Sequence, residues 1–322
     1  MAGRLIISLD FELMWGVRDH KSISSYGDAV LGGRHAIPMM LGRFKQNRIH
    51  ATWATVGLLF ARNRDEMLAF APAIRPTYTD PRLSPYPALK HHIGRDETAD
   101  PHHFGRSLLD NIADTEGQEI ATHTYGHIYA LEPGMTPEAW RADLTAAIAI
   151  AENAGHRLRS IVFPRNQFSV ASIQACRDQG LSVFRGNPSG TLYRPRPASK
   201  LRLPVRAARF VDGVLPIAGP LDFAPPQEQS GTTDVPASRF LRPWNPRFPA
   251  YSRLHLAQIL REMTHAARNG RCYHLWWHPH NMGRDTGRNM DQLDRILNQF
   301  ARLRDDFGFE SATMAEAAAV RA

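Results

Sequence analysis

Two acidic residues, Asp10 and Glu12, stand directly after the apolar run Arg4–Leu9, which is typical of a buried strand. Residues two apart on an extended segment project to the same side, so both carboxylates can enter one site. Taken alone, an Asp-x-Glu pattern after a strand indicates little, because many such residues cap helices. Its weight comes from the other segments that end in the same way.

A histidine pair, His123 and His127, is the sharper signal. It follows the strand-like run Glu119–Thr122, and two histidines four apart face together on a helical turn, where both imidazoles can reach one divalent ion. Some such pairs arise by chance among 15 histidines. Here, however, the pair falls at a strand end, as the carboxylates do, and in a parallel α/β fold those ends gather at one face.

Two further apolar runs end in a side chain that could act in catalysis. The run at residues 161–163 is followed, after a proline, by Arg165, and a run of aromatic residues is followed by His278. His274 lies inside the same strand pattern, as a core histidine does, and His280 lies beyond the strand, where it can stabilise the loop. We therefore predict that His278 is the functional histidine of this segment.

Strand-like and helical patterns alternate along the whole chain. The strand-like runs are mostly apolar and lie at Arg4–Leu9, His50–Val56, Glu119–Thr122, Ser160–Phe163, Leu181–Phe184 and Cys272–Trp277. The helical patterns lie at Gly33–Gln46, Pro137–Ala154, Ser169–Gln179, Arg253–Arg268 and Met290–Asp306. This alternation predicts an α/β fold with a parallel sheet, either open or closed into a barrel.

Two long segments, Pro72–Phe104 and Asn187–Ala250, have no clear periodicity. The first is rich in proline, tyrosine, histidine and charge, and the second carries many of the chain's 23 prolines. Such segments in an enzyme are substrate-facing loops about as often as they are surface decoration. Because we find no internal repeat and no convincing linker, we expect residues 1–322 to form one domain with loop insertions at about 72–104 and 187–250.

The composition is that of a globular protein, with 43% hydrophobic and 22% charged residues among 322. No apolar run approaches the roughly 18 residues that a membrane helix needs. The apolar stretch at the N-terminus is too short for a signal peptide, so we expect a cytoplasmic protein without a transmembrane segment. Two cysteines, Cys176 and Cys272, exclude a disulfide framework and a thiolate metal cluster.

The net charge is +8, and only four of the 39 basic residues are lysines. Such an excess of arginine could indicate an anionic partner, such as a phosphate, a nucleotide or an anionic membrane surface. It could equally reflect a compositional bias of the source genome, with arginines spread over solvated faces. The basic residues form no long run and no pattern with aromatic residues, which favours this second interpretation and speaks against nucleic-acid binding.

Taken in chain order, the four segments resemble the motifs of the polysaccharide deacetylase (NodB-homology, carbohydrate esterase family 4) superfamily. The matching stretches are Ser8–Glu12, in the Asp-x-Glu variant of the first motif, Glu119–His127, Phe163–Arg165 and Trp276–Pro279. The motif that usually supplies an aspartate partner for the acid histidine is not matched, and Asp212 and Asp222 are candidates for it. The resemblance implies a distorted (β/α) barrel with its site at the C-terminal ends of the strands.

The resemblance also implies a role for each residue. It implies a divalent metal ion, Zn²⁺ or alternatively Co²⁺, Ni²⁺, Mn²⁺ or Fe²⁺, and the implied ligands are Glu12, His123 and His127. Asp10 would take the proton of the attacking water, and Arg165 would hold Asp10 ionised and oriented. His278 would protonate the departing amine, which is a poor leaving group without a proton.

The implied reaction is hydrolysis of an N-acyl group, most often acetyl, on an amino sugar. Because no export signal is found, a nucleotide- or lipid-linked intermediate of surface polysaccharide synthesis fits better than a polymer of the cell wall. One alternative is an allantoinase-like or imidase-like hydrolase of cyclic ureides on the same fold. Another is a carbohydrate-binding relative without catalytic activity, although such a protein would usually have lost one of these site residues.

Overall fold

The computed structural model describes residues 2–197, 200 and 203–319. Its strands are β1 (Arg4–Phe11), β2 (Ala51–Thr55), β3 (Gln118–Thr122), β4 (Ser160–Val162), β5 (Val183–Arg185), β6 (Glu228–Gln229), β7 (Thr232–Asp234), β8 (Arg239–Phe240), β9 (Cys272–Trp277) and β10 (Glu310–Ala312). Its α-helices are α1 (Ile23–Asn47), α2 (Arg64–Phe70), α3 (Tyr86–His91), α4 (Arg106–Ala113), α5 (Pro137–Asn153), α6 (Val170–Asp178), α7 (Leu203–Asp212), α8 (Pro249–Arg268), α9 (Thr286–Phe307) and α10 (Met314–Ala319).

The strands form one sheet in the order β6-β7-β5-β4-β3-β2-β1-β9-β8. Strand β1 pairs with β9 along one edge, and with β10 and then β2 along the other. Every strand pair is parallel except the β6–β7 hairpin. Parallel strands need crossover connections, which here are mostly helices, so the alternation in the sequence predicted this arrangement correctly.

The segment 232–241 closes the sheet into a barrel. Its first half pairs with β5, where the N–H of Val235 donates to the carbonyl of Phe184 at 2.9 Å. Its second half pairs with β9, where the N–H of Ser238 donates to the carbonyl of His274 at 2.8 Å. The same segment therefore joins the two ends of the sheet, and the barrel predicted from the sequence motifs is confirmed.

The interior of the barrel changes from apolar to polar along its axis. The apolar end is a buried cluster to which six strands, the segment 232–241 and α10 contribute: Ile6, Ala54, Val162, Val183, Val235, Cys272, Ala312, Met314 and Ala317. Because successive side chains on a strand alternate between its faces, the positions two and four residues beyond Ile6 are the inward-facing Ser8 and Asp10. The polar end therefore lies at the C-terminal ends of the strands.

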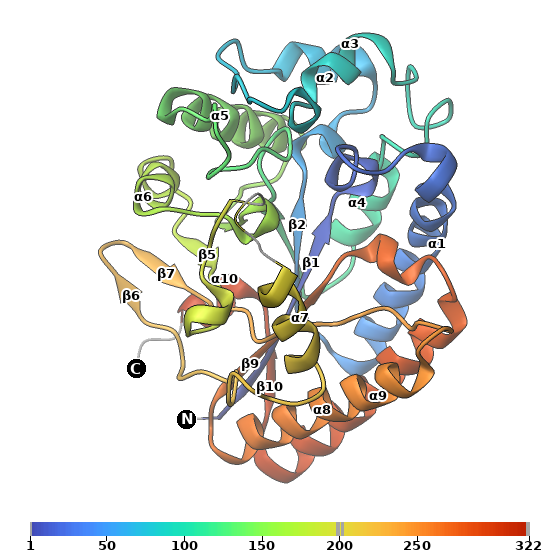
Figure 1. The fold of residues 1–322 in the computed structure, drawn as a ribbon, viewed down its shortest axis with the longest axis vertical. Helices are drawn as coiled ribbons and strands as arrows, with labels where there is room; N and C mark the ends of the chain where they lie inside the picture. Colours follow the sequence, from blue (N-terminus) through green and yellow to red (C-terminus); the bar gives the residue numbers. More distant parts are fainter. Residues whose placement is uncertain (1, 198–199, 201–202, 320–322) are drawn as a thin grey trace.

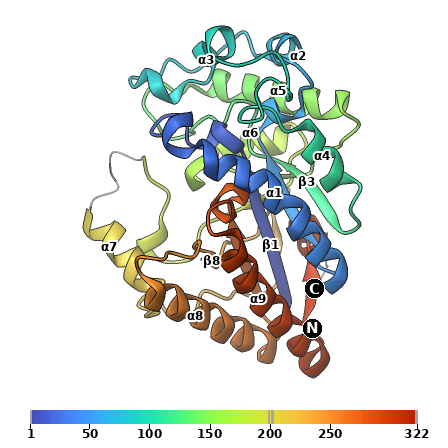
Figure 2. The same cartoon turned by 90° about the vertical axis from the view of Figure 1, so that its right-hand side faces the viewer.

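Helices surround the barrel on its outside. Helices α1, α9 and α8 lie side by side along one flank, and α5 and α6 pack together on another (Figures 1 and 2). A large apolar cluster fills the space between these helices and the strands. The helical patterns of the sequence match α1, α5, α6, α8 and α9, but α1 begins at Ile23 rather than at Gly33, after a capping box at Ser22.

The segment Pro72–Phe104 lies at the C-terminal ends of the strands, over which α2 and α3 are also seen in Figure 1. The segment Asn187–Ala250 lies there only in part, because Phe223 pairs with Cys272, the first residue of β9, at the opposite end of the barrel. In the first, the hydroxyl of Tyr78 donates to the carbonyl of Tyr129 at 3.2 Å, in the loop that follows β3. The second contains α7 and β6–β8, so part of it belongs to the barrel and not to a loop. Within the described residues, no helix is long and apolar enough to cross a membrane.

Candidate metal centre and active site

The carboxylate of Glu12 lies among four imidazoles at the polar end of the barrel. Its Oε2 is 3.0 Å from Nε2 of His127 and 3.4 Å from Nε2 of His123. Its Oε1 is 3.5 Å from Nε2 of His278 and 3.9 Å from Nε2 of His280. All of these side chains are buried except that of His278, which is 25% exposed. The acidic residue and the histidine pair, widely separated in sequence, thus meet as expected.

The three groups Glu12, His123 and His127 fit a divalent cation. Their ligand atoms lie within 4.8 Å of one another. The Nδ1 of His123 is 2.7 Å from the carbonyl of Val162, which assigns the ring proton to Nδ1 and leaves the Nε2 lone pair directed at Glu12. Burial lowers the pKa of His127 to about 4, which keeps this imidazole in the neutral form that binds metals. The Nε2 lone pair of His123 and the carboxylate of Glu12 repel each other, and a cation between them turns this repulsion into attraction.

A tight loop, and not a helical turn, brings the two histidines together. Thr124 and His127 have φ values of 65° and 52°, in the left-handed region. Two backbone N–H groups of this loop donate to the buried carboxylate of Asp143 on α5, at 2.6 and 3.1 Å. The predicted helical turn between His123 and His127 is therefore wrong, although the predicted convergence of the two imidazoles is correct.

Asp10 forms a buried ion pair with Arg185, the last residue of β5. Nη1 donates to Oδ1 at 2.7 Å and Nη2 donates to Oδ2 at 2.8 Å. Burial raises the pKa of Asp10, but the charge of Arg185 and the hydrogen bonds that it donates outweigh this effect and hold the pKa below its ordinary value. Asp10 is therefore a carboxylate at neutral pH, as a general base must be.

The structure does not place Arg165 against Asp10, so this sequence prediction is corrected. Arg165 has a φ of 55°, and its guanidinium pairs with Asp19 and lies 4.2 Å from the centre of the Tyr129 ring. The neighbouring residue Asn166 is the one that reaches the site, since its Oδ1 accepts a hydrogen bond of 3.0 Å from the arginine that orients Asp10.

Sequence reasoning missed Arg185, although a signal was present. This arginine directly follows the strand-like run Leu181–Phe184, and the rule that selected Arg165 at a strand end applies to it equally well. Ser8 and His274 support it from behind: Nη1 of Arg185 donates to Oγ of Ser8 at 2.9 Å, and Oγ lies 2.8 Å from Nε2 of His274. Burial lowers the pKa of His274 to about 3, so this histidine is a neutral core residue.

His278 faces the site from β9, opposite the histidine pair. Its Nε2 lies 3.6 Å from Oδ2 of Asp10, and its Nδ1 lies 3.2 Å from Nδ2 of Asn281. The amide of Asn281 also lies 3.2 Å from the hydroxyl of Tyr26, which can donate or accept, so the amide can present either its NH₂ group or its oxygen to Nδ1. The orientation with the oxygen toward Nδ1 suits the imidazolium form, in which Nε2 also carries a proton.

Neither aspartate considered as a partner of His278 contacts it. Asp212 binds Tyr193 and Arg239, and Asp222 binds Arg271 and a histidine on α8. Both candidates are wrong, and Asn281 occupies the corresponding position next to Nδ1 of His278.

His280 is a second residue that sequence reasoning did not place in the site. The short 3₁₀ turn Pro279–Met282 folds back, so that the ring of His280 stacks on the ring of His278. Their centroids are 5.1 Å apart and the interplanar angle is 7°. Glu12, His278 and His280 thus form a second group with metal-ligand spacing. The distances from Glu12 are shorter to the first histidine pair, which makes that pair the better ligand set.

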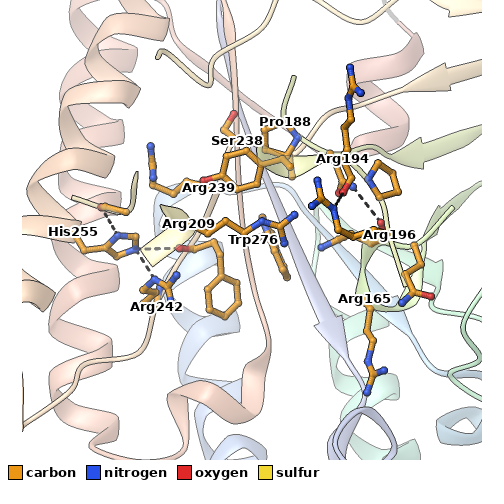
Figure 3. Close-up of a pocket in the computed structure, with 18 residues that line it drawn as sticks. Arg165, Pro188, Arg194, Arg196, Arg209, Ser238, Arg239, Arg242, His255 and Trp276 are labelled. Carbon is orange, nitrogen blue, oxygen red and sulfur yellow. Dashed lines mark hydrogen bonds between the residues drawn. The ribbon is translucent and has the colours of Figure 1, made fainter. Parts of the chain in front are cut away.

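Two cavities lie near His278, which lines neither of them but contacts Phe240 and Trp276 of one and His280 and Asn281 of the other. One, of about 360 Å³, is lined by Trp276, Phe240 and several arginines (Figure 3). The other is lined by His280, Asn281 and aromatic side chains that include Trp244 and Tyr251.

Comparisons with known proteins define the class of fold. No family model matches the sequence, and no curated protein matches it. A protein from Mycobacterium smegmatis assigned as a polysaccharide deacetylase has a similar structure, with a TM-score of 0.57 and 14% identity over 98% of this chain and 89% of that one. Puue allantoinase is similar with a TM-score of 0.55 and 10% identity over 98% of this chain and 87% of that one.

A third similar structure is the GH57-type branching enzyme of the archaeon Pyrococcus horikoshii, with a TM-score of 0.55 and 13% identity over 98% of this chain and 70% of that one. The chain therefore shares its fold with these proteins, one of which is assigned as a polysaccharide deacetylase, and this is the fold that its four motifs predicted. Because enzymes with different activities share this fold, the reaction has to be argued from the site.

Proposed function

We propose that this protein is a metal-dependent amidohydrolase that removes an N-acyl group, acetyl in the simplest case, from an amino sugar. The observation that carries the proposal is the position of Glu12. Its carboxylate faces two buried imidazoles on one side, while a buried, ionised Asp10 and a partly exposed His278 lie on the other side. Metal ligands, base and acid are thus within reach of one substrate atom.

In this proposal Glu12, His123 and His127 hold the metal, for which Zn²⁺ is the first choice. When bound, the metal lowers the pKa of a water molecule and polarises the acyl carbonyl. Asp10 accepts the proton of that water, and Arg185 keeps the Asp10 carboxylate ionised and fixed in orientation.

His278 acts on the opposite side of the scissile bond. In the imidazolium form, its Nε2 donates a proton to the departing amine and leaves a neutral ring, and the amide of Asn281 next to Nδ1 holds the ring in the required orientation. The ring is the only one of the four imidazoles that is substantially exposed, which gives it access to a leaving group.

The finer proposal is that the amino sugar is linked to a nucleotide or a lipid through phosphate, as an intermediate of surface polysaccharide synthesis. The arginines that line the cavity beside Trp276 support an anionic substrate.

The test is acetate release by the Zn²⁺-loaded protein from a panel of N-acetylated sugars and sugar nucleotides, with allantoin as the competing substrate. We expect acetate release that a chelator abolishes and added Zn²⁺ restores. Glu12→Ala and His123→Ala should lose metal and activity together, while His278→Ala keeps its metal. Hydrolysis of allantoin alone would make the protein a ureide hydrolase. Sugar binding without acetate release by the metal-loaded protein would make it a binding protein.

A further inference from the structure

The cavity beside Trp276 has an unusual charge composition. Six arginines line it, namely Arg165, Arg194, Arg196, Arg209, Arg239 and Arg242, and its lining contains no aspartate or glutamate. Figure 3 shows Arg239 and Arg242 on one side of the cavity, Arg194 and Arg196 on the other, and Arg209 between them. Like charges gathered around an open space repel one another, so this arrangement needs a physical explanation.

Some of these charges are neutralised within the protein. Arg239 is buried and pairs with Glu262 at 2.5 Å and with Asp212 at 3.3 Å. Arg165, which is exposed, pairs with Asp19. These two arginines are accounted for by structural ion pairs, and they contribute little net charge to the cavity.

The other four arginines differ, since among the described residues none of them forms an ion pair with a carboxylate. Arg194 is exposed, so its charge stays in water, which leaves Arg196, Arg209 and Arg242. All three are partly buried. Burial lowers the pKa of Arg209, and the nearby charge of Arg196 adds to this effect. Positive charge that is partly removed from water and has no carboxylate partner is costly, and an anion in the cavity would compensate it.

The three side chains are held in place by neutral groups. Nε of Arg209 donates to the carbonyl of Leu192 at 3.0 Å, and Nη2 of Arg196 donates to that of Thr191 at 3.0 Å. The guanidinium of Arg242 lies 5.4 Å from the centre of the Phe210 ring. These contacts position the side chains without cancelling their charges, and each guanidinium keeps free N–H donors.

The cavity lies next to the catalytic groups. Trp276, in its wall, lies under the guanidinium of Arg185 at 4.2 Å, and Phe240, also in its wall, is 5.5 Å from the His278 ring. A group bound in the cavity is therefore separated by one side chain from the proposed acid, and by two, Trp276 and Arg185, from the proposed base. This spacing suits a substituent of the substrate that does not itself react.

We propose that this cavity is a phosphoryl subsite, in which Arg196, Arg209 and Arg242 bind a diphosphate group of the substrate. The inference rests on the proposed function and adds a specificity site to it. The planar guanidinium fork matches two oxygens of a phosphoryl group, and arginine suits this contact better than lysine. The three partly buried, uncompensated cations match the two to three negative charges of a diphosphate better than the single charge of a sugar carboxylate.

The first experiment measures binding of inorganic pyrophosphate to the full-length protein by isothermal titration calorimetry. We expect Arg209→Gln to weaken binding about tenfold or more, since hydrogen bonds to charged groups are individually strong. Arg209→Lys should fall between wild type and Arg209→Gln. The matched control Arg302→Gln, which removes an exposed arginine of α9 outside the cavity, should leave binding unchanged. Equal affinities of wild type and Arg209→Gln, or equal affinities for glucuronate and pyrophosphate, would overturn the proposal.

Glu12→Ala separates this proposal from the proposed function. Pyrophosphate can also bind to a metal ion, and Glu12→Ala tests for this because the variant should lose its metal. If the arginines bind the anion, the variant loses turnover with the metal but retains pyrophosphate binding. Loss of binding in Glu12→Ala would assign the anion to the metal and overturn the subsite. Pyrophosphate binding by a wild-type protein that releases no acetate from any substrate would leave the subsite standing and refute only the proposed reaction.

UDP and farnesyl diphosphate distinguish the two sources of a diphosphate. Tighter binding of UDP than of pyrophosphate supports a nucleotide-linked substrate, and tighter binding of farnesyl diphosphate supports a lipid-linked one. If the protein binds pyrophosphate but neither UDP nor farnesyl diphosphate, the cavity is not a substrate subsite and the proposal is overturned. In steady-state kinetics, Arg209→Gln should raise KM for a diphosphate-linked sugar and leave kcat and the activity on the free sugar nearly unchanged.

Discussion

Replacement of Arg185 by methionine should move the acid limb of the pH–rate profile upward. In the native protein the guanidinium donates two hydrogen bonds to Asp10, and the two side chains are 0% and 4% exposed. Without this partner, burial becomes the dominant influence and raises the pKa of Asp10. An adjacent opposite charge typically lowers the pKa of an aspartate by about 1–3 units, and we expect a shift of that size.

The same change should alter the pH dependence of stability, and its sign can be worked out. In the wild type the pKa of Asp10 is lower in the folded than in the unfolded state, so its ionisation stabilises the fold above the unfolded pKa. In Arg185→Met the folded-state pKa is raised instead, and stability is lost as the pH rises. Breaking a buried pair costs about 3–5 kcal/mol, and this deficit should narrow as the pH falls and Asp10 becomes neutral.

The assay is kcat/KM for acetate release between pH 5 and 9, beside metal content and urea unfolding at each pH. Arg185→Lys keeps the charge and should retain much of the low-pH activity. The matched control is Arg165→Met, which removes the arginine that the sequence motif singled out but that pairs with Asp19. A shifted acid limb in Arg165→Met, with an unshifted one in Arg185→Met, would refute the assignment of Arg185 to Asp10.

Three further variants test the rest of the site. Asp10→Asn should keep the metal and lose about 10²–10⁴-fold in turnover, and near-normal turnover would assign the base to another group. His278→Ala should depress amide hydrolysis strongly and hydrolysis of an activated ester much less, since such an ester needs no proton on its leaving group; if His280→Ala shows this selectivity instead, His280 is the acid. Asp143→Ala leaves two buried N–H groups without their acceptor, so the free energy of unfolding should fall by about 2–4 kcal/mol. Metal affinity should fall as well, because these N–H groups belong to the loop between His123 and His127. Unchanged metal affinity would mean that this loop holds its shape without Asp143.

Much of the fold and most of the candidate site follow from the sequence, because both depend on local patterns. Apolar runs and helical periodicity identify the central strands and the long helices. Parallel strands bring their C-terminal ends together, which is why Asp10, Glu12 and His278 could be expected in one place. The short strands β6–β8 and β10 have two or three residues each, too few to give a periodic signal.

The wrong predictions concern residues whose side-chain direction depends on the local course of the backbone. Arg165 and Arg185 both follow strands, but Arg165 lies in a turn with a φ of 55° that aims it at Asp19, while Arg185 is still within β5 and faces inward. His280 lies beyond a strand, yet a 3₁₀ turn folds it back onto His278. A single sequence does not encode such turns in its hydrophobic pattern, since they depend on contacts with distant segments.

The closure of the barrel by the segment 232–241 separates the residues around Glu12 from residues 187–231, which line part of the cavity. These two sets of residues could therefore change at different rates in evolution. The chain leaves the barrel at Gly186, whose carbonyl accepts a hydrogen bond of 2.9 Å from Ala237, and a Cβ on that glycine would lie only 2.1 Å from a carboxylate oxygen of Asp234. The exit and the return of the excursion 187–231 are therefore in contact. The entropic cost of a longer excursion grows only slowly with its length.

Because its two ends lie side by side, the excursion 187–231 can be regarded as one exchangeable insertion, here called the cassette. It carries Arg194, Arg196 and Arg209, whereas Arg185 and the residues around Glu12 lie outside it. Exchange of the cassette would alter which molecules enter the neighbouring cavity without displacing the groups that carry out hydrolysis. If the proposed activity holds, selection or protein engineering could thus change which molecules bind by altering one contiguous stretch of the chain.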